Sequence, residues 1–231
     1  MWVITVASCK GGSGKTTLTG QIGVQAERAG AGPVAFLDAD EQGSLGGWWR
    51  EREAETPWFA TATHSGIKTD LAGLQSLGVR GAFVDTPAGR GGPVAQAIRC
   101  SDLVLVPIRP SPHDIRAAGQ VLELAQRYRK PSLFVLNAAT AHSRLVEQAA
   151  ALLRDHVDVA PVILHHRSDY AASMIDGRTV MELKRPGKSA AEIVALWNHI
   201  AALLPPRENT ICAGGHNPQA TNLAPLFAAT I

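Results

Sequence analysis

Short apolar segments alternate with longer amphipathic segments along most of this chain. Five apolar runs rich in strand-forming residues lie far apart, at residues 2–7, 34–37, 82–84, 103–106 and 133–136. Between them, apolar side chains recur at helical spacing in residues 16–28, 93–99, 114–129 and 143–155. Strands that are apolar on both faces and alternate with helices are typical of a parallel sheet covered on both sides. We therefore predict an α/β fold with a mostly parallel, twisted sheet flanked by helices on both faces.

Residues 1–204 are predicted to form one domain, because no stretch rich in Gly, Ser or charged residues divides them. The final 27 residues differ in composition. They hold four of the 14 prolines and two charged side chains, Arg207 and Glu208, without clear periodicity. We predict an irregular or poorly ordered tail over residues 205–231.

The composition fits a globular protein with a substantial core. Hydrophobic residues make up 45% of the 231 positions and charged residues 18%, and the formal net charge is +2. Any nucleic-acid binding must therefore come from local basic patches. No apolar run approaches the roughly 18 residues that a membrane span needs, and the N-terminus lacks the basic segment of a signal peptide. We expect a soluble cytoplasmic protein that does not bind a membrane.

A glycine-rich segment follows the first apolar run and precedes the first helical segment. Residues 10–17 read KGGSGKTT, and the glycines allow positive φ angles, so that backbone N–H groups can converge on phosphate oxygens. The following helix adds its positive N-terminal end. We predict that Lys15 reaches the β- and γ-phosphates of a nucleotide and that the Thr16 hydroxyl ligates Mg²⁺. The nucleotide-binding residues predicted in this loop are Gly11, Gly12, Ser13, Gly14, Lys15, Thr16 and Thr17.

Three aspartates stand where apolar runs end. Asp38 and Asp40 follow the run at 34–37, and alternation along a strand puts both on the same side. Two carboxylates at the C-terminal end of a parallel strand suit the positioning of a metal ion and of water. The alternative is a pair of turn-forming or helix-capping residues. Asp85 ends the run at 82–84 and can accept hydrogen bonds from water bound to Mg²⁺, so Thr16, Asp38 and Asp85 form the predicted metal site.

These segments together resemble the ParA/MinD family of ATPases. A standard phosphate loop has glycine where this chain has Cys9, and the additional Lys10 matches the family's deviant Walker A motif, KGGxGKT followed by Ser or Thr. Residues 38–44, DADEQGS, resemble its switch I motif, DxDPQGS, with Glu41 in place of proline. Residues 85–89, DTPAG, resemble its switch II motif.

Residues 104–115 resemble the family's Pro-rich loop at the dimer interface, although a rigid loop with Asp114 capping a helix would look the same, and residues 189–204 resemble its last helix. The resemblance covers residues 1–204 and is to small ParA-type partition ATPases without an N-terminal DNA-binding domain, since one residue precedes the first predicted strand.

The resemblance implies a role for each matching residue. Lys10 would cross a dimer interface to contact the partner's nucleotide, and Lys15 would bind phosphates in its own subunit. Asp40 would orient or deprotonate the attacking water, and Asp38 would hold a water molecule bound to magnesium. Asn137 resembles the asparagine that contacts adenine, although a plain turn residue after a strand would look the same. The implied catalytic residues are thus Lys10, Lys15 and Asp40.

The resemblance also implies an ATP-driven switch that uses ATP and Mg²⁺ as cofactors. The ATP-bound protein would form a sandwich homodimer and bind DNA of the nucleoid without sequence preference. A ParB-like or other partner protein would stimulate its slow ATP hydrolysis and release it. The cargo would be plasmid or chromosomal DNA, or another particle that the switch positions.

Other functions share this nucleotide-binding core. Sequence does not separate a partition ATPase from an accessory ATPase of conjugative DNA transfer, and a metabolic P-loop ligase also stays open. A MinD-type membrane ATPase would need a basic amphipathic C-terminal helix, for which the predicted tail offers only Arg207. An iron–sulfur relative needs a second cluster ligand beside Cys100, but Cys9 and Cys212 lie far from it in sequence.

Two stretches carry much of the basic charge. Residues 109–130 hold five basic side chains against two acidic ones, and residues 178–188 hold four against one, so each has a net charge of +3. Doubled across a dimer, such patches could bind DNA in a salt-sensitive way. Solvated helix faces often have the same composition, so the sequence leaves both interpretations open.

Overall fold

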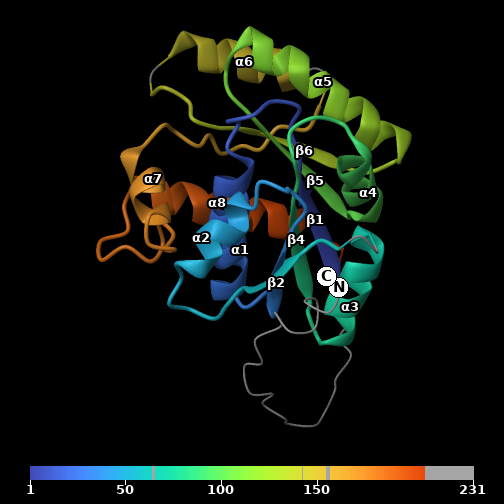
Figure 1. Cartoon of the computed structure of the whole chain (residues 1–231). Helices are drawn as coiled ribbons and strands as arrows, with labels where there is room; N and C mark the ends of the chain where they lie inside the picture. The colour runs from blue at the N-terminus through green and yellow to red at the C-terminus, as the bar shows by residue number, and fades with distance from the viewer. Residues whose placement is uncertain (64–65, 142, 155–156, 206–231) are drawn as a thin grey trace.

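The computed structural model describes residues 1–63, 66–141, 143–154 and 157–205, and Figure 1 shows the course of the chain. Within these residues the strands form one sheet in which all neighbouring pairs are parallel. The predicted α/β fold with a parallel sheet is thus confirmed. The strand order is β3 (Trp58–Thr61), β2 (Val34–Asp38), β4 (Gly81–Asp85), β1 (Trp2–Val6), β5 (Leu103–Ile108) and β6 (Ser132–Leu136).

Helices cover both faces of the sheet, as predicted (Figure 1). One face packs against α1 (Lys15–Arg28), α2 (Ser44–Arg50), α7 (Ser168–Met174) and α8 (Lys188–Leu203). The other face packs against α3 (Ile67–Ser76), α4 (Gly92–Cys100), α5 (Pro112–Arg127) and α6 (Arg144–Arg154). The core is therefore divided into two layers by the sheet.

The packing between α1 and β2 is unusually close. Every residue of β2 is buried, and the Phe36 ring of this strand lies against α1 where the helix has Gly23. A Cβ at Gly23 would lie 2.1 Å from Phe36 Cε1, so a side chain there would have to displace the ring. The helix that follows the glycine-rich loop is thus packed directly on the strand that ends in Asp38.

The strand order places the predicted site residues together at the carboxyl ends of the central strands. β1 lies between β4 and β5, and the chain leaves β1 toward β2 on one side before it later reaches β5 on the other. The carboxyl end of β1 is therefore a topological switch point, where open α/β sheets bind ligands. The glycine-rich loop follows β1, and Asp38 and Asp85 end β2 and β4.

Strand β3 and helices α2, α3 and α7 are absent from the predicted elements. β3 has four residues, lies at the edge of the sheet and directly follows Pro57. α2 has seven residues, two of them adjacent glycines of low helix propensity. In α3 the signal is present in the sequence, since its buried apolar residues Ile67, Leu71 and Leu74 follow helical spacing.

The C-terminal region is described only in part. The last helix expected at residues 189–204 corresponds to α8. Of the predicted tail only Pro205 is described, so the expectation for residues 206–231 lies outside the described residues and the domain boundary stays a prediction. Among the helices that are described, none has the length and apolar character needed to cross a bilayer.

Candidate functional site

The glycine-rich loop leads from β1 into α1 and leaves the start of that helix open. Gly12 and Gly14 have φ angles of 70° and 93°, a region that favours glycine. A Cβ on Gly14 would also lie 2.3 Å from Asn137 Nδ2. Within the described chain no side chain caps the N-terminus of α1, and its first turn carries no acidic residue. The positive helix end and the loop amides can therefore bind a phosphate.

Two buried polar side chains of the loop fit a bound triphosphate. Lys15 is 8% exposed and Ser13 is 4% exposed. The Ser13 hydroxyl has no hydrogen-bond partner in the part of the chain that the structure describes, and a buried hydroxyl left in this state costs about 1–3 kcal/mol. Phosphate oxygens would supply the missing acceptor beside the Lys15 ammonium, so the loop fits a nucleotide.

Asp85 is a buried carboxylate beside the loop. It is paired in register with Asp38 across β4 and β2 and accepts a hydrogen bond of 2.7 Å from the Thr16 hydroxyl. Burial raises the pKa of Asp85 to about 7; the Thr16 hydrogen bond opposes this rise, and the nearby Asp38 charge adds to it. A divalent cation would stabilise the charged carboxylate.

The donors around Asp85 fit Mg²⁺ held jointly with a nucleotide. Mg²⁺ is usually bound by one or two carboxylates together with substrate phosphates. No group of three or more His, Cys, Asp or Glu side chains that could hold a metal ion occurs among the described residues. The structure brings Thr16 against Asp85 and places Asp38 on the neighbouring strand, and phosphates would have to complete the coordination.

Asp38 and Asp40 occupy different environments. The Asp38 carboxylate is 2% exposed and accepts hydrogen bonds from the amides of Gly46 (3.0 Å) and Asp40 (3.1 Å). Burial raises the pKa of Asp38, and these amides partly oppose the rise. Asp38 therefore stabilises the first turn of α2, which is the alternative that the sequence left open. Asp40 is half-buried and lines the nearby cleft, where a water-positioning role requires it.

A cleft of about 860 Å³ lies at the carboxyl ends of β1, β2 and β4. Three segments wall it: the glycine-rich loop with the start of α1, the loop after β2, and the loop after β4 with the start of α4. The lining residues are Gly11, Gly12, Gly14, Lys15, Thr16, Thr17, Ala39, Asp40, Glu41, Gln42, Ser44, Pro87, Ala88 and Pro93. The segments that resemble Walker A, switch I and switch II thus meet in one cleft.

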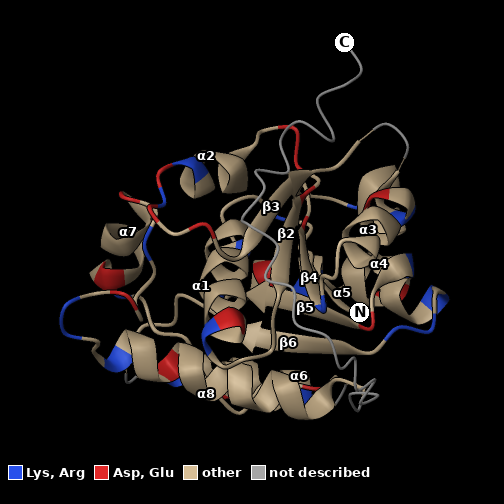
Figure 2. Ribbon diagram, turned by 90° about the horizontal axis from the view of Figure 1, so that it is seen from below, with Lys and Arg blue, Asp and Glu red and all other residues tan. Residues whose placement is uncertain are grey.

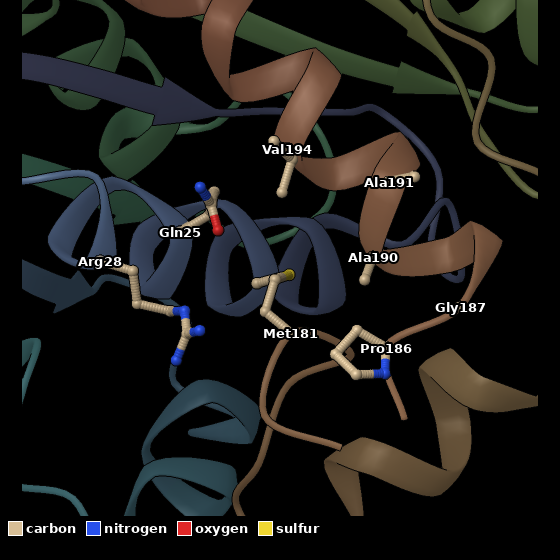
Figure 3. A pocket seen from close by; sticks show the side chains of 8 residues that line it. All are labelled: Gln25, Arg28, Met181, Pro186, Gly187, Ala190, Ala191 and Val194. Carbon is tan, nitrogen blue, oxygen red and sulfur yellow. The ribbon is translucent and has the colours of Figure 1, made fainter. Parts of the chain in front are cut away.

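A second hollow of about 680 Å³ lies between α1 and α8 (Figure 3). Its lining residues are Gln25, Arg28, Met181, Pro186, Gly187, Ala190, Ala191 and Val194. None of them is a carboxylate, and none is a predicted site residue. We therefore place the candidate chemistry in the cleft beside the glycine-rich loop.

Three contacts from later parts of the chain hold the glycine-rich loop. Asn137 Nδ2 donates a hydrogen bond of 2.8 Å to the carbonyl oxygen of Ser13, and the Arg109 guanidinium donates to the carbonyl oxygen of Gly12. Lys10 Nζ lies 2.7 Å from Asp114 Oδ1. The adenine contact expected for Asn137 stays a prediction, since here its amide supports the loop.

Sequence reasoning missed the contacts of Arg109 and Asp114 with the loop. Arg109 lies between β5 and α5 and Asp114 in the first turn of α5, both about 100 positions after the loop. The sequence predicted here a Pro-rich loop like one at the family's dimer interface, or a rigid loop with Asp114 as a helix cap; in the structure the cap is Ser111. The register of β1 with β5 brings this segment beside the loop, and no local pattern reports that proximity.

Of the basic residues in the two stretches, only Arg178 belongs to an ion pair of the described chain. Arg178 is bonded to the carboxylate of Asp176. Lys184, Arg185 and Lys188 are exposed on the segment that leads into α8, and none of them belongs to an ion pair of the described residues. Figure 2 shows this basic segment at the edge of the molecule.

The chain is similar to known proteins over most of its length. The family model "CobQ/CobB/MinD/ParA nucleotide binding domain" matches residues 4–180. "Maintenance of carboxysome distribution protein A" of Halothiobacillus neapolitanus is 30% identical over 215 residues, which cover 86% of this chain and 96% of that protein. "Protein ParA" of Rhizobium radiobacter is 28% identical over 210 residues, covering 84% of this chain and 91% of that protein.

A solved structure supports the fold at lower identity. The ATP complex of a McdA variant from Cyanothece superposes with a TM-score of 0.71 and 16% sequence identity, covering 87% of this chain and 96% of that one. At this identity the likeness shows the fold alone.

Proposed function

The chain belongs to the CobQ/CobB/MinD/ParA nucleotide-binding family of P-loop ATPases, and from this we propose that it is a Mg²⁺-dependent ATPase acting as a positioning switch. One observation carries the proposal. The Thr16 hydroxyl, at the start of α1, is hydrogen-bonded to the buried Asp85 at the end of β4, beside an open helix N-terminus. This arrangement brings a phosphate site and a metal site into direct contact.

Each residue of the site has a chemical task in this proposal. Bound ATP would supply the phosphoryl group, and Mg²⁺ would neutralise its charge. Lys15 binds the β- and γ-phosphates, and Thr16, Asp38 and Asp85 hold the metal. Asp40 orients or deprotonates the attacking water. Catalysis then consists mostly of positioning and charge stabilisation, with little covalent chemistry on the protein.

We further propose that ATP joins two subunits into a sandwich dimer in which Lys10 contacts the partner's nucleotide. Dimer formation would pair two weak basic surfaces, and effective concentration can raise their joint affinity by about 10² or more. The dimer would bind DNA of the nucleoid in the cytoplasm without sequence preference. A ParB-like partner would stimulate hydrolysis and release it.

The cargo has two candidates. Plasmid or chromosomal DNA is favoured by the similarity to Protein ParA. A protein particle is favoured by the similarity to a protein for carboxysome distribution. Accessory function in conjugative transfer, MinD-type positioning and a metabolic ligase activity remain alternatives, and the last two would not depend on DNA.

The experiment measures binding to random-sequence duplex DNA by mobility shift, at low and moderate salt, with Mg²⁺ and ATP, a nonhydrolysable ATP analogue or ADP. We expect binding with ATP and with the analogue but not with ADP, and a steep loss of affinity with salt. Lys15→Ala should bind neither nucleotide nor DNA. Asp40→Ala should bind both but fail to hydrolyse ATP, so that the dimer accumulates.

Two outcomes would contradict the proposal. Unchanged ATP affinity in Lys15→Ala would exclude the phosphate-loop assignment. A wild-type dimer that does not bind DNA even at low salt would exclude the nucleoid as the surface to which it binds. Positioning on another surface, or a metabolic reaction, would then account better for the site.

A further inference from the structure

Lys10 is held by a carboxylate of its own subunit. Its ammonium nitrogen lies 2.7 Å from Asp114 Oδ1, although the two residues are 104 positions apart in sequence. Asp114 lies in the first turn of α5, where the Ser111 side chain caps the helix by accepting a hydrogen bond from the Asp114 amide. The carboxylate is thus fixed at a helix start, next to the beginning of the glycine-rich loop.

The two partners of this ion pair differ in freedom. The Lys10 side chain is 43% exposed, whereas that of Asp114 is 13% exposed. The Arg109 guanidinium, from the same segment as Asp114, donates to the carbonyl oxygen of Gly12 and also ties this segment to the loop. The pair therefore consists of a cation that solvent or another molecule can reach and an anion that the fold holds in place.

We propose that Asp114 is a positioning residue that retains Lys10 in its own subunit until a nucleotide-bound partner competes for the ammonium. The inference rests on the proposed function, in which Lys10 contacts the partner's nucleotide. An ammonium paired with a carboxylate attracts a phosphate less than a free ammonium does, and the carboxylate itself repels the phosphate. A triphosphate competes better than a diphosphate, so the ion pair makes dimer formation depend more strongly on the γ-phosphate.

The strength of such a pair suits a reversible role. Ion pairs with solvent access contribute little to stability, so this one can open while α5 stays folded. A symmetric dimer opens the pair once in each subunit. Neutralising Asp114 should therefore lower the dissociation constant of the ATP-dependent dimer by about 2- to 30-fold.

The experiment compares Asp114→Asn with the wild type by sedimentation, in Mg²⁺ with a nonhydrolysable ATP analogue or with ADP. We expect the substitution to tighten the dimer with the analogue and to produce some dimer with ADP. Glu123→Gln is the matched control, because it removes one charge from an exposed position of the same helix, about 13 Å further along its axis. This control and Asp114→Glu, which keeps the charge, should behave like the wild type.

A second measurement reports on Lys10 itself in the nucleotide-free monomer. An amine-reactive acetyl ester modifies exposed lysines, and mass spectrometry gives the rate at each position. We expect Lys10 to react about 2- to 5-fold faster in Asp114→Asn and at the wild-type rate in Glu123→Gln. Circular dichroism checks the fold, and Asp114→Ser, whose hydroxyl also suits a helix start, replaces the variant if it is unfolded.

The outcomes separate the two proposals. Faster modification of Lys10 together with a tighter dimer supports the role of Asp114. An ATP-dependent dimer of equal or lower affinity in Asp114→Asn overturns that role and leaves the proposed function intact. A tighter dimer without a change in the modification rate of Lys10 overturns it too, since Asp114 would then act only through the net charge of the subunit. If neither protein dimerises with the analogue, the proposed function fails and this inference fails with it.

Discussion

Among single residues, Asp85, which we propose as a metal ligand, also affects the stability of the nucleotide-free protein. Its folded-state pKa of about 7 lies above the ordinary value of 3.8 because the carboxylate is buried. The stability that Asp85 contributes in its protonated form is therefore complete below about pH 4 and is lost as the pH rises through 7. At neutral pH and above, the fold disfavours the charged carboxylate, and in the proposed function a bound cation would offset this.

Replacing Asp85 by Asn should remove this cost. In the absence of nucleotide and Mg²⁺, we expect Asp85→Asn to be more stable than the wild type by about 1–3 kcal/mol at pH 8, and the gain to shrink toward pH 5. Urea unfolding at the two pH values measures it. Glu41→Gln, at an exposed carboxylate of the same cleft, should show no such gain. A variant less stable than the wild type at pH 8 would contradict this account.

Residue positions that depend on a local motif were predictable, whereas long-range partners were not. The glycines, Lys15 and Thr16 follow one another in a pattern that phosphate chemistry dictates. The bond between Lys10 and Asp114 depends on where the start of α5 falls relative to β1. Nothing in either local sequence reports that distance, so only the folded chain reveals the pair.

At the scale of elements, a buried ion pair joins the end of α2 to the segment before α8. The Arg52 side chain is 2% exposed and donates to both carboxylate oxygens of Glu182, at 2.9 and 3.1 Å, and to the carbonyl oxygen of Gly177. Its guanidinium lies 5.0 Å from the centre of the Trp48 ring. Burial would raise the pKa of Glu182, but the hydrogen bonds from Arg52 and Thr179 outweigh it and lower the pKa.

Arg52→Met should therefore destabilise the protein by about 2–4 kcal/mol at pH 7, because it leaves a partly buried carboxylate unpaired. Since the folded pKa of Glu182 is lowered, its contribution is present at neutral pH and is lost as the pH falls through that pKa. The difference between the proteins should thus be smaller at pH 4. Urea unfolding at both pH values tests this. Arg178→Met, which breaks an exposed ion pair, is the control, and an equal loss in both variants would argue against a special role of burial.

Differences in burial and tertiary support explain why some elements were not predicted from the sequence. Strands β2, β4 and β5 are buried at every residue and appear in the sequence as continuous apolar runs. Strand β3 lies at the edge of the sheet with one buried residue among four, so its pattern is weak. Helix α2 depends on the Asp38 carboxylate, which accepts a hydrogen bond from its backbone. Such tertiary support has no signature in the helix's own sequence.

For the whole molecule, a net charge of +2 conceals an uneven distribution. Two carboxylates are bonded within the fold: Glu182 to Arg52, and Glu192 to Arg167 and to the His165 ring. Lys184, Arg185 and Lys188 have no ion-pair partner among the described residues and stay exposed on the segment before α8. If the protein binds DNA as proposed, these cations can meet phosphates, as can the basic residues of 109–130, none of which belongs to an ion pair of the described chain.

Reversing the charge of Lys184, Arg185 and Lys188 to Glu should spare the ATP-dependent dimer and weaken DNA binding at low salt by at least about tenfold. The slope of log affinity against log salt should fall by about 5 if each of the six side chains in the dimer meets one phosphate. Mobility shift across a salt series measures both quantities. A variant with Glu at Arg127, Arg129 and Lys130 has the same net charge. If the two variants lose affinity equally, neither segment is the specific contact.

The contact between Gly23 and Phe36 limits the ways in which the protein can change shape. Because the ring lies on the helix backbone with no room for even a methyl group, α1 cannot slide along β2 without breaking a close-packed contact. Helix α1 and strand β2 are therefore packed as one unit. If the site binds a nucleotide as proposed, we expect its response to lie mainly in the two loops after β2 and β4, which this contact does not restrain.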